Sequence, residues 1–194
     1  KIMVNKIKIV SIIGTGLMGR EIAAWSVLYG YTLRLFNRTS ESQEKTKKFI
    51  AESLGEEKKE LLERITYHTN LSETIKDADL IIESVPERLE LKKEILSKID
   101  KAALPHAIIA TNSSSFPVSK LEDAVKRKDK VLNIHFYILP RVPMADIMRG
   151  TKTSDETFRK GKEWIESIKC VPLVVKKECL GFVFNRVWRA VKKE

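Results

Sequence analysis

The sequence is poor in cysteine, histidine and proline, and it contains no long apolar run. Its 194 residues include two cysteines, three histidines and six prolines. Cys170 and Cys179 do not form a C-x-x-C pair and have no histidine near them in sequence, so we expect free buried thiols and no disulfide or metal site. No apolar stretch approaches the roughly 18 residues of a membrane span, and the N-terminal residues lack the apolar core of a signal peptide. We therefore expect a cytoplasmic protein without a metal centre or a membrane span.

The composition is that of a folded globular protein, with 43% apolar and 32% charged residues. The net charge of +10 raises the question of a nucleic-acid partner. However, the lysines and arginines are spread among acidic residues, without interleaved aromatics or a recognisable nucleic-acid module. We expect a solvated basic surface and no nucleic-acid partner. The alternative is that the excess of positive charge attracts a polyanionic small molecule.

Short apolar runs alternate with longer helical patterns along the chain. This alternation predicts an α/β fold with a doubly wound, mostly parallel sheet, in which the strands after residue 135 run antiparallel. The expected strands are 7–13, 32–36, 65–68, 80–85, 107–111, 131–135, 145–148 and 172–175. The expected helices are 17–29, 41–53, 56–63, 87–102, 118–125 and 155–168.

A glycine-rich turn directly follows the first apolar strand. Residues 14–19 read GTGLMG, after the apolar run of 7–13 and before a helical pattern that Gly30 ends. Gly14 permits the tight turn, Gly16 lets backbone N–H groups approach a phosphate, and Gly19 lets the helix pack close to the strand. The alternative is a glycine turn without a ligand. With a strand before it and a helix after it, the motif predicts a dinucleotide site that includes Gly14, Gly16, Leu17, Met18 and Gly19.

The residue that closes the second strand influences which dinucleotide binds. An acid there bonds the ribose 2′-hydroxyl of NAD, whereas a neutral residue followed by arginine accommodates the 2′-phosphate of NADP. Here Asn37 lies eighteen residues after Gly19 and is followed by Arg38. This pair favours NADP through forked pairing of the guanidinium with a phosphate. Alternatively, Asn37 and Ser40 only form the turn and cap the next helix.

Three segments of the second half carry polar residues where chemistry is expected. The strand 107–111 ends in TNSSS (residues 111–115), the strand 131–135 ends in His135, and Asn185 lies at a helix start. Side chains at the carboxyl ends of parallel strands share the ligand-binding edge of such a sheet. Each feature also has a structural alternative: a polar turn, a structural histidine and a helix-terminal amide.

At this point the sequence resembles the 3-hydroxyacyl-CoA dehydrogenase family, specifically its NAD-binding domain, from Ile7 to about Val187. Five motifs stand in the order typical of that family. They are GTGLMG (14–19), ADLIIESVPE (78–87), TNSSS (111–115), HFY (135–137) and GFVFNR (181–186). The resemblance implies a Rossmann-type fold, NAD as cofactor and reversible oxidation of a 3-hydroxyacyl-CoA to a 3-oxoacyl-CoA in fatty acid metabolism.

The resemblance also implies a role for individual residues. His135 matches the catalytic base, which accepts the proton of the substrate 3-hydroxyl as hydride leaves C3. Asp146 matches the acid that orients this histidine. Ser114 and Asn185 match residues that hydrogen-bond the reacting oxygen. Residues matching the cofactor site further include Glu87, Lys92 and Asn112.

The chain departs from the family pattern at several places. The family has glutamate where this chain has Asp146, and its His-Phe-Phe segment is followed by Asn-Pro, whereas this chain has Ile138-Leu139-Pro140. The helical arm with which the family holds coenzyme A is reduced to about residues 53–64, where Lys58 and Lys59 are either coenzyme A contacts or solvated side chains.

We expect residues 1–179 to form the dinucleotide-binding domain. Residues 180–194 are expected to form the first helix of a C-terminal helical domain that is missing or truncated, so that a second copy or a partner subunit covers this helix. Two alternatives to the acyl-CoA dehydrogenase remain open. One is an oxidoreductase of the related β-hydroxyacid dehydrogenases acting on a substrate without coenzyme A, which residues 36–39 resemble. The other is a nucleotide-binding protein without catalytic activity.

Overall fold

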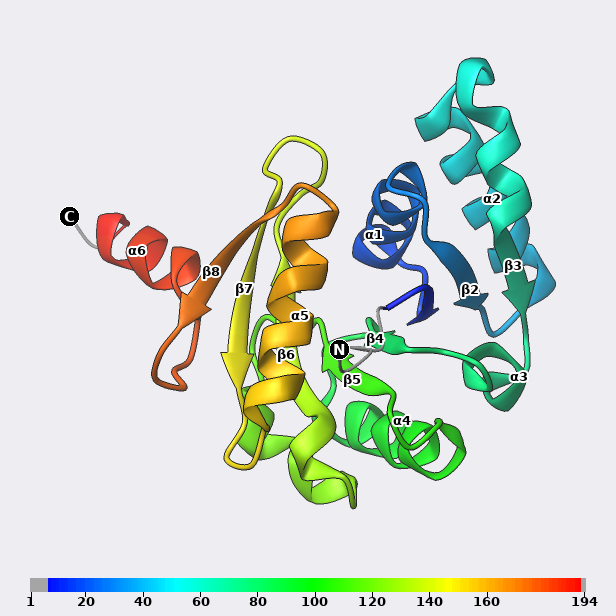
Figure 1. Cartoon of the computed structure of the whole chain (residues 1–194). Coiled ribbons are helices and arrows are strands. Elements are labelled where there is room, and N and C mark those ends of the chain that lie inside the picture. Colours follow the sequence, from blue (N-terminus) through cyan, green and yellow to red (C-terminus); the bar gives the residue numbers. More distant parts are fainter. Residues whose placement is uncertain (1–6, 193–194) are drawn as a thin grey trace, which may run out of the picture.

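The protein is built around one eight-stranded sheet with helices packed on both of its faces (Figure 1). The structure is a computed structural model that describes residues 7–192. The strands lie in the order β3-β2-β1-β4-β5-β6-β7-β8. Their bounds are β1 Ile9–Ile13, β2 Thr32–Phe36, β3 Ile65–His68, β4 Leu80–Glu83, β5 Ile108–Thr111, β6 Val131–Phe136, β7 Met144–Arg149 and β8 Val171–Val175. All eight strands expected from the sequence are present, so the prediction of an α/β doubly wound sheet is confirmed.

The strands β1 to β6 are parallel, and successive residues of each strand face opposite layers of helices. Ile12 packs in the core cluster that contains residues of α1 (Leu17–Leu28), α2 (Ser40–Leu54) and α5 (Asp155–Ser167). Ile13 packs in the second cluster, with residues of α3 (Leu71–Ile75) and α4 (Leu89–Ala102). Burial on both faces explains why the central strands β1, β4 and β5 are mostly apolar.

The strand order reverses direction between β1 and β4. From β1 the chain winds outward to β2 and β3, and it then returns to β4 on the other side of β1. In open parallel sheets, ligands bind outside the carboxyl ends of the strands at such a switch point. The turn at 14–19 follows β1 and therefore lies at this position.

The last two strands differ partly from the expectation. β7 runs antiparallel to β6, as predicted, but β8 runs parallel to β7. The physical reason is the helix α5 between β7 and β8. It carries the chain back to the edge of the sheet at which β7 begins, so that β8 runs in the same direction as β7. The prediction that every strand after residue 135 is antiparallel is therefore wrong for β8.

The helical elements also correct three expectations. The segments expected as helices at 56–63 and 118–125 are three-ten turns: η1 Glu56–Arg64, η2 Val118–Lys120 and η3 Glu122–Ala124, with η4 Lys128–Lys130 following. Non-helical backbone interrupts η1 at Lys58, where φ is −123°. Leu121 separates η2 from η3. The helix α3 was not expected, because five residues carry too little periodicity to detect.

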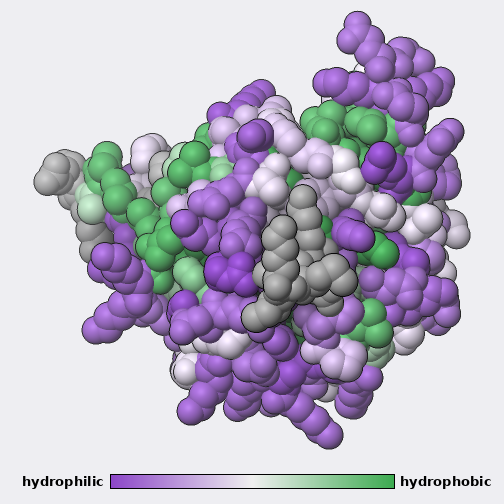
Figure 2. Space-filling model, viewed as in Figure 1, coloured by the Kyte–Doolittle hydropathy of each residue, from purple (hydrophilic) through white to green (hydrophobic). Residues whose placement is uncertain are grey.

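The helix expected from Leu180 begins later, as α6 (Phe184–Val191), after a turn in which Gly181 has φ of 80° and Phe182 has φ of 50°. The remaining residues of the two expected domains, 1–6 and 193–194, lie outside the described residues. Exposed apolar side chains gather on β8, α6 and the turn between them, at the left of Figure 2. These are Val171, Val174, Leu180, Val183, Val187, Trp188 and Val191. Among residues 7–192, no helix combines the length and apolar character that crossing a membrane requires.

Candidate functional site

The glycine-rich turn contains two glycines that packing requires and one that leaves open space. A Cβ atom on Gly14 would lie 2.7 Å from the Ser84 carbonyl oxygen, and one on Gly19 would lie 2.0 Å from the Gly14 carbonyl oxygen. Gly14 also has φ of +96°, which favours glycine. A Cβ on Gly16 would meet no atom within 4 Å. Gly14 and Gly19 thus shape the turn, while Gly16 leaves a gap at the start of α1 that a bound group can fill.

The N-terminus of α1 has free hydrogen-bonding capacity. Gly16 occupies the cap position and offers no side chain, and the first turn, which includes Leu17 and Met18, contains no acidic residue. In contrast, side-chain caps close α2, α3 and α5, from Thr39, Asn70 and Ser154. The first N–H groups of an uncapped helix carry partial positive charge and bind anions. This arrangement fits a dinucleotide pyrophosphate.

Asn37 is buried at the end of β2 and points toward the glycine turn. Its Nδ2 atom donates to the hydroxyl of Thr15 and, at 3.1 Å, to the hydroxyl of Thr46. Its Oδ1 atom is buried and has no partner among the described residues. A buried acceptor without a donor costs free energy, which a hydroxyl group placed here would recover. This site therefore suits a ribose, whereas Arg38 beside it is exposed.

The N-cap of α2 tests the alternative that Asn37 and Ser40 only form the turn and cap the next helix. Thr39 accepts a hydrogen bond from the Ser42 amide at 3.2 Å, and Thr39 is the N-cap residue. Asn37 and Ser40 therefore do not cap this helix. Lys58 and Lys59 lie exposed on η1, and Lys59 is 3.3 Å from Glu56.

A buried ion network lies below the carboxyl edge of the sheet, next to the glycine turn. The Lys92 ammonium on α4 is 2.9 Å from Oε1 of Glu83, at the end of β4, and 3.2 Å from Oε2 of Glu87. Glu83 also accepts from the Val85 amide at 2.8 Å and from the Thr111 hydroxyl at 2.7 Å. The network brings together Glu87 and Lys92, two of the residues that the family resemblance implies for the cofactor site.

Glu87 is held as a carboxylate. Burial by itself would raise the pKa of Glu87, but the hydrogen bond from the Ser113 hydroxyl and the charge of Lys92 outweigh it and lower the pKa below its usual value. The same carboxylate accepts from the Ser115 amide at 2.9 Å. Glu87 thereby ties the segment after β5 to the segment after β4. The buried partner Glu83 stands in the motif at 78–87 but had no role assigned from the sequence.

Asn112 and Ser114 follow β5 but differ in surroundings. Asn112 accepts from the Phe136 amide at 2.9 Å and donates to the Ser84 hydroxyl at 3.3 Å, so its side chain links the ends of three strands. Ser114 is partly buried, and its hydroxyl has no hydrogen-bond partner among residues 7–192. Ser114 is therefore available to a ligand, whereas Asn112 is already engaged.

His135 and Asp146 form a buried pair across the antiparallel strands β6 and β7. They are direct partners in the strand register, which places both side chains on the same face of the sheet. The His135 Nδ1 atom lies 3.1 Å from the Asp146 Oδ2 atom. Although aspartate is shorter than glutamate by one methylene, it reaches the imidazole because the two strands are hydrogen-bonded here. The Asp146 Oδ1 atom is buried without a partner among the described residues.

Two aromatic residues complete the surroundings of His135. The Phe182 ring stacks on the imidazole with centroids 5.1 Å apart and planes 28° apart. The Tyr137 hydroxyl donates to the Asp146 Oδ2 atom at 2.5 Å. The sequence analysis assigned neither residue, although strand alternation places residues 135 and 137 on one face. Asn185 is the second residue of α6 and is partly buried.

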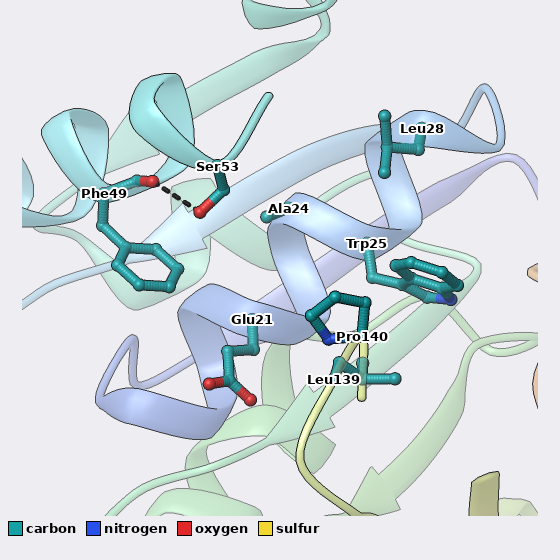
Figure 3. Close-up of a pocket in the computed structure, with 8 residues that line it drawn as sticks. All are labelled: Glu21, Ala24, Trp25, Leu28, Phe49, Ser53, Leu139 and Pro140. Carbon is teal, nitrogen blue, oxygen red and sulfur yellow. Dashed lines mark hydrogen bonds between the residues drawn. The ribbon is translucent and has the colours of Figure 1, made fainter. Parts of the chain in front are cut away.

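A small apolar pocket lies between α1, α2 and the loop after β6 (Figure 3). Glu21, Ala24, Trp25 and Leu28 come from α1, Phe49 and Ser53 from α2, and Leu139 and Pro140 from the loop. Its volume of about 110 Å³ is well below the roughly 300 Å³ at which drug-sized sites begin. The pocket can hold a short apolar group but no dinucleotide. Burial raises the pKa of Glu21 at its edge.

The comparisons with known proteins show the family to which the chain belongs. The chain matches the family model described as "3-hydroxyacyl-CoA dehydrogenase, NAD binding domain" over residues 9–179. It is 30% identical over 197 residues to an L-carnitine dehydrogenase of Bacillus cereus, covering 98% of this chain and 60% of that protein. It is 32% identical over 188 residues to a 3-hydroxybutyryl-CoA dehydrogenase of Clostridioides difficile, covering 91% of this chain and 66% of that protein.

A solved structure is equally similar. The (S)-3-hydroxybutyryl-CoA dehydrogenase from Ralstonia eutropha superimposes with a TM-score of 0.88 and 30% identity, covering 94% of this chain and 68% of that chain. The chain spans about 60–66% of the length of the two curated relatives above. With the motifs, the fold and these matches in agreement, the chain belongs to the 3-hydroxyacyl-CoA dehydrogenase family and corresponds to its NAD-binding domain.

Proposed function

We propose that this chain is the cofactor-binding and acid–base part of an NAD-dependent oxidoreductase that interconverts a 3-hydroxyacyl-CoA and a 3-oxoacyl-CoA. The observation that carries the proposal is the buried His135–Asp146 pair on β6 and β7, in the same sheet as the dinucleotide turn after β1. Because β1 and β6 are both parallel strands, His135 lies toward the edge at which the glycine turn begins. The relatives named as 3-hydroxybutyryl-CoA dehydrogenases support the same substrate class.

In the proposed reaction, His135 moves the proton. With Nδ1–H donating to Asp146, the Nε2 atom of a neutral imidazole has a lone pair to accept the proton of the substrate 3-hydroxyl. NAD, when bound, would supply the acceptor for the hydride from C3. The substrate alcohol then becomes a ketone, and the His135 imidazole becomes an imidazolium. The Asp146 carboxylate stabilises this imidazolium, and in the reverse direction His135 returns the proton. Ser114 and Asn185 would hydrogen-bond the oxygen on which charge develops.

The cofactor is proposed to lie across the first half of the sheet. Its pyrophosphate would meet the N–H groups of α1 at residues 16–18, and its ribose would meet the Oδ1 atom of Asn37. We propose NAD as the preferred dinucleotide, in line with the NAD-binding family. Arg38 is the reason to measure NADPH beside NADH, because an exposed guanidinium next to the ribose can pair with a 2′-phosphate.

The test is turnover of acetoacetyl-CoA with NADH by the chain and its His135→Ala variant. We expect the variant to lose about 10²- to 10⁴-fold in turnover because the proton donor is gone, while its dissociation constant for NADH stays within about twofold. The matched control is His106→Ala, since His106 lies near Asp79, which bonds the start of β1 at the opposite edge of the sheet. Equal turnover by the wild type and His135→Ala would contradict the proposed role.

A second candidate is an oxidoreductase for a 3-hydroxy acid that carries no coenzyme A. Two observations favour it: the arm after α2 is only the three-ten segment η1, and one relative is named L-carnitine dehydrogenase, a name without coenzyme A. Assaying free acetoacetate beside acetoacetyl-CoA separates the two. Faster turnover of the free acid would favour this candidate, and tight NADH binding without any turnover would favour a non-catalytic nucleotide-binding protein.

The apolar side chains exposed on β8 and α6 support a covering partner. We propose that residues 1–179 are the dinucleotide-binding unit and that α6 begins a helical unit packed against further chain or against a second copy. A role in fatty acid metabolism and a cytoplasmic location belong to the same proposal. Sedimentation of the chain at several concentrations tests for the second copy.

A further inference from the structure

We propose that Tyr137 is a positioning residue that shares the Asp146 carboxylate with His135 and thereby sets the protonation behaviour of the imidazole. The inference rests on the proposed function, in which His135 moves the proton. It concerns a residue that neither the motif analysis nor the family resemblance gave a role. The structure contains a His–Asp–Tyr triad in which the Tyr137 hydroxyl is the stronger of the two donors to Asp146.

The geometry of the three residues carries the proposal. His135 in β6 and Tyr137, which directly follows this strand, both contact the Asp146 Oδ2 atom. The His135 Nδ1 atom lies 3.1 Å from Oδ2, and the Tyr137 phenol oxygen lies 2.5 Å from it. The Tyr137 ring also contacts the imidazole edge-on, with centroids 5.2 Å apart. The shorter contact is within the range of hydrogen bonds to charged oxygens, whereas the contact to His135 is long.

Asp146 depends on these two donors. The residue is fully buried, and its second oxygen, Oδ1, has no hydrogen-bond partner among residues 7–192. A buried carboxylate with few donors is costly, so each remaining donor matters. The Tyr137 hydroxyl satisfies part of the charge on Oδ2 and keeps the short side chain of Asp146 turned toward His135.

The shared oxygen has a direct consequence for His135. A carboxylate whose charge is partly satisfied by a phenol attracts an imidazolium less than a carboxylate bound by the imidazole alone. Tyr137 therefore weakens the ion pair between Asp146 and the imidazolium form of His135.

Several neutral groups lie around the triad. The stacked Phe182 is uncharged, and Cys179 packs, partly buried, against the apolar cluster that contains Phe182. Glu178 in the same segment accepts a hydrogen bond from the Ser119 amide at 2.9 Å. On the β5 side, Asn112 is a neutral amide that accepts from the Phe136 amide, between the two rings. Within the part of the chain that the structure describes, Asp146 and Tyr137 are the titratable groups whose side chains contact His135.

The test is an NMR titration of the imidazole C–H signals in the chain, with the His135 signal assigned by its loss in His135→Ala. In Tyr137→Phe we expect the titration midpoint of His135 to rise by about 0.5 to 1 pH unit, because the whole carboxylate charge then acts on the imidazolium. The matched control is Tyr31→Phe, which removes an equally short hydrogen bond, 2.5 Å to the Ser167 hydroxyl, elsewhere in the core. In that control the His135 midpoint should stay within about 0.2 units.

The outcomes are distinguishable from those of the proposed function. A midpoint that is unchanged or lowered in Tyr137→Phe overturns the triad, whatever the substrate proves to be. A shifted midpoint with no turnover of any 3-oxo substrate keeps the triad and contradicts the catalytic proposal. If both hold, the acid limb of the pH profile of kcat/KM in Tyr137→Phe should move upward by the same amount as the NMR midpoint, and in Tyr31→Phe it should not move.

Discussion

Replacing Lys92 with methionine should destabilise the protein by about 3 kcal/mol. Removing one partner of a buried ion pair costs about 3 to 5 kcal/mol, because the other charge is left without compensation. The Lys92 side chain is 1% exposed and is 2.9 Å from Glu83, 3.2 Å from Glu87 and 3.3 Å from the Val85 carbonyl oxygen. We expect the lower end of the range because Glu83 keeps two further donors, the Val85 amide and the Thr111 hydroxyl.

The assay is thermal unfolding followed by circular dichroism. For a chain of this length, about 3 kcal/mol corresponds to a fall in Tm of about 6 to 12 °C. The matched control is Lys93→Met, which removes the next lysine along α4. Its ion pair with Asp123 is equally short, 2.9 Å, but the side chains are 28% and 63% exposed, so the loss should stay below about 1 kcal/mol.

A double variant tests whether the loss comes from the charge pair. In Glu83→Gln/Lys92→Met both charges are gone, so the loss in stability should be smaller than the sum of the two single losses by at least about 1 kcal/mol. Additive losses, or a Lys92→Met variant as stable as Lys93→Met, would refute the reasoning that the network is held together by charge.

Three further predictions concern the turn, the acid limit and the thiols. Gly16→Ala should change the free energy of unfolding by less than about 1 kcal/mol yet weaken NADH binding at least tenfold. Gly19→Ala should disrupt the turn, because its Cβ would lie 2.0 Å from the Gly14 carbonyl oxygen. Calorimetry measures unfolding and NADH binding in both variants, and wild-type NADH affinity in both would contradict the site. Because the pKa of Glu87 is lower in the folded chain than its ordinary 4.5, the stability it contributes is complete above about pH 4.5 and is lost as the pH falls through the folded value. The free energy of unfolding, measured with urea, should therefore fall less steeply from pH 6 to pH 3 in Glu87→Gln than in the wild type. Equal slopes in the two proteins would count against this prediction. Burial raises the pKa of the Cys170 thiol to about 11, so it should react with a disulfide reagent at pH 8 at least tenfold more slowly than a free thiol, and rapid labelling of two thiols in the folded chain would be the contrary result.

The fold could be predicted from the sequence because the strands are buried on both faces. A run such as residues 80–82 is wholly apolar, and the neighbouring strand β1 has Ser11 as its one polar residue. The direction of β8 was predicted wrongly, although the helix expected at 155–168 is the kind of connection that joins two parallel strands. The three-ten segment η1 was also missed, since its composition suits a helix and only the backbone at Lys58 interrupts it.

The candidate site could be predicted where the function of a residue follows from its type and its place in a motif. The glycines of the turn and the histidine at the end of β6 are examples. Glu83 and Tyr137 could not be predicted, because their importance comes from contacts across strands: Glu83 meets Lys92 and Thr111, and Tyr137 meets Asp146. A carboxylate or a phenol in an apolar strand looks the same in sequence whether or not such a partner exists.

The register between β6 and β7 separates the position of the proton-transfer pair from the shape of the apolar pocket beside it. His135 opposes Asp146 through backbone pairing alone, and Phe136 opposes Ala145 one step later. Between the two strands, Tyr137 donates to Asp146, whereas the residues after it contribute Leu139 and Pro140 to the small apolar pocket. Changes at positions 138–143 can therefore alter which molecules fit beside the sheet while His135, Asp146 and Tyr137 stay in place. In evolutionary terms, substitutions in the connection between β6 and β7 can change substrate preference without removing proton transfer by His135.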